Sequence, residues 1–346
     1  MSFRSFPKKE AVLVVYVHVI HNPGESREVW EPLYRLAVPA SAFELELLQH
    51  PALQRLRHIR HYGAAALVCP VKHSRYDHTV GVWALAKTFF PDWRELHAAA
   101  LMHDAGHLPF SHAFESKIGK DHHAQTERWI YSESITRILR KHGLSPDTIT
   151  RLLNTDSPLS HRSEYLGIDH LDSFLRDTAA AGCFPDTPST WIGRLGFEGC
   201  YLNAADEETA MKLIEAVVLD HRIFLNPYHV ALDALLGEAV ARWLGEEAGR
   251  IDEVVTMTDH RLLSELEQAP DPVVRSLVRV LLEEPHRLVL CDEGEADAYR
   301  AEVRKVYARQ PLVDGQPFAA RSPKAKALLG ELDTMKGSFC FRIHDG

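Results

Sequence analysis

The sequence predicts a mainly α-helical protein with a small mixed α/β appendage formed by its two ends. Apolar residues recur at helical spacing in most segments after residue 40. β-branched or alternating apolar stretches stand near the ends, at 11–20 and 337–343. We therefore expect a helical core over residues 40–245, with 1–39 and 246–346 as accessory segments.

The first part of the chain is expected to begin with a strand and to continue as helices. The β-branched stretch 11–20 predicts a strand, and 33–38 predicts a short strand or a turn. Apolar spacing predicts helices over 43–50 and 51–61, with a proline in the first turn of the second. The apolar run 64–70 predicts a strand or an extended link.

The rest of the chain is predicted to be helical for most of its length. Helices are expected over 77–90, 95–105, 111–118, 124–142, 162–178, 206–224 and 228–245. The second of these is almost entirely apolar, which predicts deep burial. The Gly-, Pro- and Trp-rich stretch 182–202 predicts a loop or a hairpin. Shorter helices are expected up to 282 and over 296–307, followed by a strand at 337–343.

Composition limits the possible partners and location of the protein. The 346 residues carry a net charge of −9, which argues against nucleic acid as the main partner. Five scattered cysteines without a CxxC pair argue against a disulfide framework and favour a reducing cytosol. The apolar stretch 12–20 is far shorter than the roughly 20 residues of a membrane span. We expect a cytoplasmic protein that does not cross a membrane.

Histidines and aspartates gather in four segments that carry the chemical argument. These segments are HSRYDH at 73–78, HDAGHLPFSH at 103–112, HH at 122–123 and DHLD at 169–172. His103 and Asp104 end an apolar helix, where a carboxylate is costly unless it is paired or bound to a metal. Imidazole and carboxylate together suit Mn, Fe, Co, Ni or Mg. Taken alone, such a pair is more often a helix end followed by an ordinary turn.

The other segments also leave alternatives open when each is considered alone. His78 at a helix start could lie at the surface, and Asp169 and Asp172 share one helix face where Arg176 could pair with them. Spacing cannot bring the remaining histidines together. A turn at 106–109 would place His107 and His112 toward a cleft, where histidine can donate a proton to a leaving oxygen.

Taken together, these motifs resemble the HD-domain phosphohydrolase superfamily, and more narrowly its deoxynucleoside triphosphate triphosphohydrolase branch. The resemblance is carried by HPALQRLRHIRHYG, HSRYDHTVGVWALA, AALMHDAGHLPFSHAFE, HHAQTERWI and GIDHLDSFLRD, in that order, with a weaker extension over YHVALDALLGEAV. It implies an HD-type helical bundle with a metal held by His78, His103, Asp104 and Asp169. It further implies catalytic roles for His107, His112, His122 and Glu115, a phosphate contact for Arg75 and a sugar contact for Asp177.

The departures from that branch fall on the substrate side of the site. His170 stands where the branch usually has lysine, and Ser173 where it has tyrosine. His61 and Tyr62 replace a glutamine and a small apolar residue near the sugar. The stretch 225–229 lacks the arginine that helps to hold a triphosphate. These positions, with Arg75 and Asp177, are our candidate substrate contacts.

The expected function is metal-dependent hydrolysis of a nucleotide. The expected cofactor is one divalent ion (Mn, Fe, Ni, Co, Mg or Zn), and a second Mg can accompany the substrate phosphates. The preferred substrate is a deoxynucleoside triphosphate, cleaved to deoxynucleoside and tripolyphosphate. One alternative is a phosphomonoesterase or phosphodiesterase acting on nucleoside monophosphates or another small phosphate ester. Another is a non-catalytic nucleotide-sensing module. The resemblance also suggests a homo-oligomer.

Overall fold

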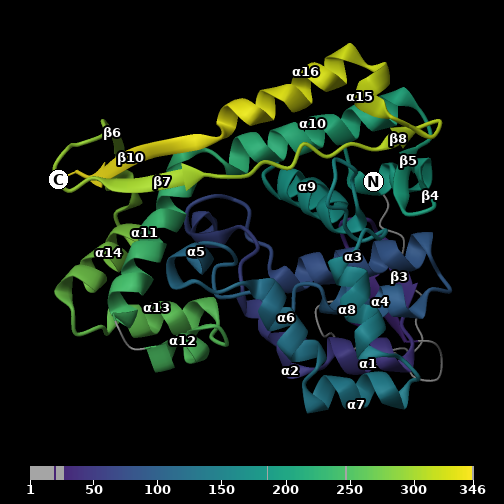
Figure 1. The fold of residues 1–346 in the computed structure, drawn as a ribbon, viewed down its shortest axis with the longest axis horizontal. Helices are drawn as coiled ribbons and strands as arrows, with labels where there is room; N and C mark the ends of the chain where they lie inside the picture. Colours follow the sequence, from purple (N-terminus) through teal and green to yellow (C-terminus); the bar gives the residue numbers. More distant parts are fainter. Residues whose placement is uncertain (1–18, 21–26, 185, 246–247, 345–346) are drawn as a thin grey trace, which may run out of the picture.

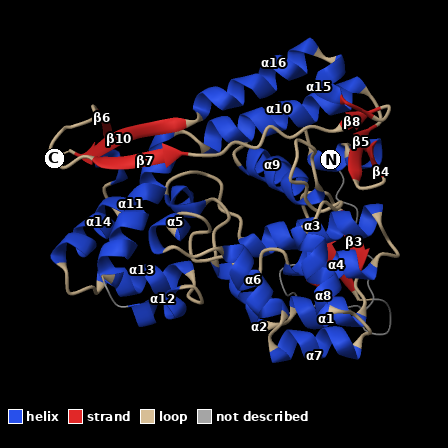
Figure 2. Ribbon diagram, viewed as in Figure 1, coloured by secondary structure: helices blue, strands red, loops and turns tan. Residues whose placement is uncertain are grey.

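The computed structural model describes residues 19–20, 27–184, 186–245 and 248–344 (Figure 1). Helices dominate it (Figure 2), so the predicted fold class is confirmed. Up to residue 180 they are α1 (Ala42–Leu48), α2 (Pro51–Arg55), α3 (Arg75–Phe89), α4 (Arg94–Met102), α5 (Glu115–Ile118), α6 (His122–Ile130), α7 (Glu133–Lys141), α8 (Pro146–Asn154) and α9 (Ile168–Ala180).

The later helices form two further groups. They are α10 (Glu207–Phe224), α11 (Pro227–Leu244), α12 (Ala248–Val254), α13 (Asp259–Glu267), α14 (Pro272–Leu282), α15 (Phe318–Arg321) and α16 (Pro323–Glu331). Short 3₁₀ helices lie at Leu56–His58, Gly63–Leu67, Pro188–Thr190, Ile192–Arg194, Pro285–Arg287 and Leu332–Met335. In Figure 1, α10 and α16 run side by side, and α11 to α14 gather at the opposite end of the molecule from α1 and α7.

The strands form three small sheets. They are β1 (Val19–Ile20), β2 (Glu28–Glu31), β3 (Leu36–Pro39), β4 (Leu195–Glu198), β5 (Tyr201–Ala204), β6 (Leu288–Cys291), β7 (Tyr299–Val303), β8 (Leu312–Val313), β9 (Gln316–Pro317) and β10 (Gly337–Ile343). The sheet orders are β1-β2-β3, β4-β5-β8-β9 and β6-β10-β7, and every pairing is antiparallel except β5 with β8. The N-terminal and C-terminal strands therefore enter different sheets.

Two large apolar clusters hold these elements together. The larger one surrounds α3 and α4, where Trp83 and Leu101 are fully buried. The second joins α11 and α14 to Phe110 and Phe114, which lie just beyond α4 in the sequence. The segment between α4 and α5 therefore has one end in each core. Among the described residues, no helix combines the length and the apolar character that a membrane span requires.

Most predicted elements are found, and the errors have physical causes. The run 64–70 is not extended: Ala-rich Gly63–Leu67 forms a 3₁₀ helix, and short apolar runs do not distinguish the two. The single helix expected over 124–142 is two, because the Ser132 hydroxyl caps α7 by accepting from the Ile135 N–H. The helix expected over 296–307 is wrong, because β7 pairs there with β10. Of the strand expected over 11–20, all but β1 lies outside the described residues.

One buried carboxylate, that of Glu44, links helices α1, α3 and α4. Glu44 of α1 is fully buried and accepts hydrogen bonds from Trp83 Nε1 (3.2 Å), Lys87 Nζ (3.0 Å) and the Ser41 N–H (2.6 Å), with His97 Nδ1 at 3.2 Å. Burial alone would raise the pKa of Glu44, but the hydrogen bonds from His97, Ser41 and Lys87 lower it to about 2. The ionised carboxylate is therefore part of the folded structure.

We expect Glu44→Gln to destabilise the fold by about 3–5 kcal/mol at pH 7, because it leaves buried donors and a cation without their partner. Since the folded pKa is depressed, this contribution is complete above pH 4.5 and is lost as the pH falls toward 2. Urea denaturation at pH 7 and pH 3 measures both effects. Glu46→Gln, on the same helix but partly exposed, is the control. Equal losses in the two variants would contradict the argument.

Candidate metal centre

Three elements bring the four predicted metal ligands together. His78 lies in the first turn of α3, His103 and Asp104 directly follow α4, and Asp169 lies in the first turn of α9. The capping box of Ser74 and Asp77 fixes the start of α3. The apolar residues that end α4 are completely buried, so the two residues that follow are held at the edge of the core.

The ligand atoms of these four residues converge. His78 Nε2 lies 3.1 Å from Asp169 Oδ1, 3.1 Å from His103 Nε2 and 3.8 Å from Asp104 Oδ2. His103 Nε2 is 3.5 Å from Asp104 Oδ1. The His78 side chain is wholly buried, whereas 29% of the Asp169 side chain is exposed. The group, which we call the metal centre, therefore opens to solvent on the side of α9.

The hydrogen bonds behind the rings show that these residues fit a cation. His103 Nδ1 lies 2.8 Å from the carbonyl oxygen of Ala100, which can only accept, so Nδ1 carries the proton. His78 Nδ1 lies 2.8 Å from Asp172 Oδ2 and donates to it in the same way. In the neutral rings, both Nε2 lone pairs then point to the place where two carboxylates also converge. Such outer carboxylate and carbonyl partners are the usual support of metal-binding histidine.

Asp172 connects His78 to a buried ion-pair network. Arg176 donates to both Asp172 oxygens at 2.8 Å and also to Glu31, and the Tyr34 hydroxyl donates to Asp172 Oδ1. Burial would raise the pKa of Asp172, but Arg176 and His78 hold it well below its ordinary value. Burial would lower the pKa of His78, but the hydrogen bonds to Asp169 and Asp172 raise it to about 9. In the absence of a metal, a proton can thus occupy part of this site.

Arg75 supports the metal centre through Asp104. Its Nη1 forms an ion pair with Asp104 Oδ2 at 2.9 Å, and its Nε donates to Ser111 Oγ at 2.8 Å. Phe110 and Ser111 both have positive φ, at 54° and 58°, which costs non-glycine residues about 1–3 kcal/mol each. The Phe110 N–H donates to Asp259 Oδ1 at 2.7 Å, and this bond helps to hold the turn.

The four predicted catalytic residues form a second group, the histidine–glutamate cluster. Glu115 accepts from His112 Nδ1 at 3.1 Å and from His122 Nδ1 at 2.9 Å. The rings of His107 and His122 stack with centroids 4.1 Å apart. Gly106 explains this approach, since an added Cβ would lie 2.2 Å from the His122 carbonyl oxygen. The motif glycine therefore lets α6 pack against the loop after α4.

His107 joins this cluster to the metal centre. Its Nε2 lies 3.0 Å from Asp104 Oδ1, and its ring is almost completely buried. Burial and the charge of Arg75 hold the pKa of His107 well below its ordinary value, so the ring is neutral near pH 7. Burial would raise the pKa of Glu115, but the hydrogen bonds from His112 and His122 hold it well below its usual range. The cluster is thus a carboxylate between two imidazoles beside the metal ligands.

The predicted substrate contacts divide into several places. His61 and Asp177 lie together, with His61 Nε2 3.6 Å from Asp177 Oδ2, and His73 Nε2 is 3.0 Å from the other carboxylate oxygen. Tyr62 is buried in a small apolar cluster and packs edge-on against Phe224. Its hydroxyl is buried without a hydrogen-bond partner. His61 therefore lies beside the metal centre, next to His78 and Asp104. Tyr62 is instead part of the protein interior.

Two candidates lie on α9 beyond the metal aspartate. The ring of His170 packs on that of Tyr307 with centroids 4.8 Å apart, and burial lowers the pKa of His170 to about 4. It therefore does not replace the charge of a lysine near neutral pH. The Ser173 hydroxyl makes no hydrogen bond with the described residues.

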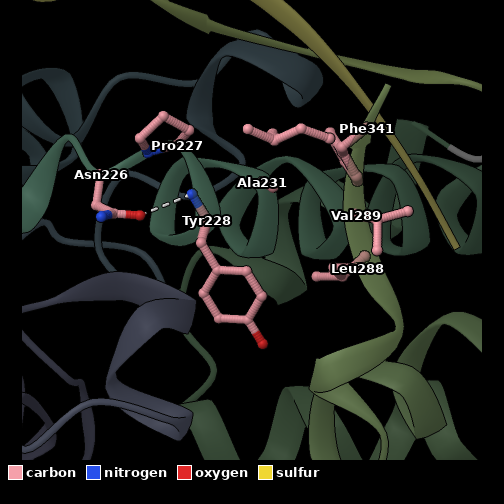
Figure 3. Close-up of a pocket in the computed structure, with 8 residues that line it drawn as sticks. Asn226, Pro227, Tyr228, Ala231, Leu288, Val289 and Phe341 are labelled. Carbon is pink, nitrogen blue, oxygen red and sulfur yellow. Dashed lines mark hydrogen bonds between the residues drawn. The ribbon is translucent and has the colours of Figure 1, made fainter. Parts of the chain in front are cut away.

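The stretch 225–229, where the triphosphohydrolase branch has arginine, begins α11. Asn226 caps this helix by accepting from the Tyr228 N–H at 2.9 Å (Figure 3). Asn226 and Tyr228 line a pocket of about 280 Å³ with Leu288 and Phe341, between α11 and the C-terminal sheet. None of the predicted metal ligands lines this pocket. At the position of the missing arginine, Asn226 thus caps α11 and borders a pocket that is separate from the metal centre.

Sequence reasoning missed three residues near the site. His73 stands in the HSRYDH segment, but spacing gave no reason to place it against Asp177. Asp220 of α10 lies beside Asp177, and burial together with that carboxylate raises the pKa of Asp220 well above its usual range. Tyr307 comes from the C-terminal part, which carried no motif. Of these three residues, only His73 lies in one of the sequence motifs.

Comparisons with known proteins show which proteins this chain resembles. A family model described as the HD domain matches residues 75–164. The chain is 26% identical over 285 residues to the metal-dependent phosphohydrolase cns2 of Cordyceps militaris, which covers 78% of this chain and 81% of cns2. It is 30% identical over 180 residues to the uncharacterized protein YwfO of Bacillus subtilis, covering 46% of this chain and only 41% of YwfO.

Two further matches concern a shorter segment and the fold. The chain is 36% identical over 86 residues to the deoxynucleoside triphosphate triphosphohydrolase SAMHD1 of Danio rerio, covering 20% of this chain and 14% of SAMHD1. A phosphohydrolase structure from Bacteroides thetaiotaomicron superposes with a TM-score of 0.69 at 16% identity, over 92% of this chain and all of that one. Residues 75–164 therefore match the HD domain, and the chain is similar over most of its length to a metal-dependent phosphohydrolase.

Proposed function

We propose that this protein is a metal-dependent phosphohydrolase that acts on nucleotides, with deoxynucleoside triphosphates as the first candidate substrates. The observation that carries the proposal is the junction at Asp104. This carboxylate faces both His103 of the metal centre and His107 of the histidine–glutamate cluster. A site for a cation and a site for proton transfer are thereby adjacent, as hydrolysis of a phosphate ester requires.

His78, His103, Asp104 and Asp169 would hold one divalent cation. Bound there, it would lower the pKa of a water molecule and polarise a phosphate oxygen. The nitrogen and oxygen donors suit Mn, Fe, Co, Ni, Mg or Zn, and the choice among them is left to metal analysis. Arg75, held against Asp104, would orient a phosphate oxygen from the inner side of the centre.

The protein's own residues would handle the proton. Glu115 orients His112 and His122 through their Nδ1 atoms, which leaves the Nε2 atom of each ring free to hold or deliver a proton. About half of the His112 side chain is exposed, so it can reach a substrate more directly than buried His107. We assign proton donation to the leaving oxygen to His112, supported by His122 and Glu115.

The sugar side of the substrate is assigned to His61 and Asp177. His61 Nδ1 is buried without a hydrogen-bond partner among the described residues, and the neighbouring Asp177 carboxylate could accept a hydrogen bond from a ribose hydroxyl. His170 and Ser173 complete the proposed contacts from α9. Tyr62 would act only by shaping the wall behind His61, because it is fully buried.

A second candidate is a phosphomonoesterase acting on nucleoside monophosphates, or a phosphodiesterase acting on another small phosphate ester. The likeness to triphosphohydrolases is confined to part of the chain, because the SAMHD1 proteins of Danio rerio and Xenopus laevis align over 86 and 149 residues. The replacement of the branch's lysine by a histidine with a depressed pKa also weakens the case for a triphosphate. A non-catalytic nucleotide sensor is less favoured, because the metal ligands and the histidine–glutamate cluster are both complete.

A substrate screen tests these proposals. Purified protein loaded with Mn would be incubated with deoxynucleoside triphosphates, deoxynucleoside monophosphates, cyclic dinucleotides and an aryl phosphate. Release of tripolyphosphate supports the first candidate, and release of orthophosphate from monophosphates supports the second. Binding of nucleotides without turnover by metal-loaded protein would indicate the sensor. Size-exclusion chromatography of the same sample tests the predicted homo-oligomer.

A further inference from the structure

The segment between β7 and β8 lies against α9 and α10, and hydrogen bonds hold it at residues 307 and 310. In Figure 1 it runs past α9 and α10. The Tyr307 N–H donates to His221 Nε2 at 2.9 Å, on α10. Three residues later, Gln310 exchanges hydrogen bonds with the strand-like segment before α9: its N–H donates to Glu164 O and its carbonyl accepts from Leu166 N–H. Residues 307–310 are therefore held in a fixed position.

This segment places an arginine near the open ligand of the metal centre. Tyr307 packs on His170, the residue next to Asp169, and the Arg309 guanidinium lies 5.7 Å from the centroid of the Tyr307 ring. Burial lowers the pKa of Arg309, and the negative charge of Asp169 opposes that shift. Asp169 is the most exposed of the four predicted metal ligands, and Tyr307, on which the Arg309 guanidinium stacks, packs against the residue next to it.

Arg309 lacks the partner that other buried arginines near the site possess. Only 7% of its surface is exposed, yet its guanidinium makes no hydrogen bond or ion pair with the described residues, and Nε is buried without a partner. By contrast, Arg75 is paired with Asp104, and Arg176 with Asp172. A buried charge without an anion is costly, so a guanidinium kept in this state is suited to receive one.

We propose that Arg309 binds a phosphate group of the substrate at the open side of the metal centre. The inference rests on the proposed function in that the ligand is a phosphate compound. A planar guanidinium matches two phosphate oxygens through parallel N–H donors. It would supply the positive charge that His170 and the stretch 225–229 do not provide. The contact with Tyr307 is the structural alternative, in which Arg309 only stacks on the ring.

Titration with inorganic phosphates distinguishes these roles. Metal-loaded wild-type protein, Arg309→Gln, Arg309→Lys and Arg304→Gln would be titrated calorimetrically with tripolyphosphate and with orthophosphate. Arg304 is a matched control, because it lies on the same segment but is largely exposed and is paired with Glu302. Metal content and thermal unfolding are measured for each variant, so that a loss of binding is separated from a loss of metal or of fold.

We expect Arg309→Gln to lower the affinity for whichever phosphate probe the wild type binds by roughly 10- to 100-fold. The metal content should be unchanged. Arg309→Lys should lie between wild type and Arg309→Gln, and it also serves as the test if the glutamine variant does not fold. Arg304→Gln should bind like wild type. Equal affinity in wild type and both Arg309 variants would overturn the inference, as would absence of binding of either probe to wild type. Substrate hydrolysis by wild type in the screen decides the proposed function separately.

Discussion

Asp104→Asn should remove the bound metal and reduce phosphohydrolase activity by about 1000-fold or more. Asp104 is the proposed ligand that faces both histidine groups, and an amide cannot supply the same anionic oxygen to a cation. Loss of the several kcal/mol that a metal contributes to phosphate chemistry corresponds to a rate loss of this size. Inductively coupled plasma mass spectrometry measures the metal, and steady-state kinetics on the substrate found in the screen measures the activity.

The stability of the same variant gives an independent measurement. Burial would raise the pKa of Asp104, but His103, His107 and Arg75 hold it well below its ordinary value. The ionised group therefore stabilises the metal-free fold above pH 3.8, and Asp104→Asn should lower its melting temperature. Added Mn should raise the melting temperature of wild type but not of the variant. Asp147→Asn, exposed on α8, is the control. Full metal content in Asp104→Asn would refute the assignment of the metal centre.

The sequence permitted this assignment because its motif residues sit at helix ends. His78 and Asp169 lie in the first turns of α3 and α9, and His103 and Asp104 lie just after α4. The order of motifs along the chain specified the set, although no spacing rule could show that three helix ends meet. Their meeting depends on packing in the larger apolar core, which is a property of the whole fold.

The substrate side was less predictable, because its residues depend on long-range packing and on the local environment. Asp220 reaches Asp177 from α10, and Tyr307 reaches His170 from a segment with no motif. The prediction of a helix over 296–307 hid this contact, since a helix there would not have run past α9 as an extended chain. Tyr62 shows the reverse case, in which a position chosen by resemblance lies in the interior.

Glu115→Gln should separate proton transfer from metal binding. The Glu115 carboxylate accepts from both His112 and His122, whereas an amide offers one acceptor and places a donor against the second ring. The variant therefore loses the orientation of one imidazole and the negative charge between the two rings. We expect kcat to fall by about 100-fold or more, within the range of general acid–base effects, with metal content unchanged.

The pH profile tests the role of the charge. Because the hydrogen bonds from His112 and His122 hold the pKa of Glu115 well below its usual range, this carboxylate stays ionised in wild type at mildly acidic and neutral pH. The neutral amide of Glu115→Gln carries no such charge, so the kcat of this variant should stay below that of wild type across the whole of that pH range. Glu133→Gln, exposed on α7, should leave both kcat and the profile unchanged. Unchanged kcat in Glu115→Gln would remove the residue from the mechanism.

The two variants together locate the metal, because both histidine groups have a donor set suited to a cation. The ligand atoms of His107, His112, Glu115 and His122 lie within 4.8 Å of one another, as do those of His78, His103 and Asp169. If the metal occupies the predicted centre, Asp104→Asn loses it and Glu115→Gln keeps it. The opposite pattern would place the metal among the histidines of the glutamate cluster and would leave His78 and His103 as its neighbours. If wild type binds two metal ions per chain and each variant loses one of them, a cation occupies both the metal centre and the histidine–glutamate cluster. Asp104 then lies between the two ions.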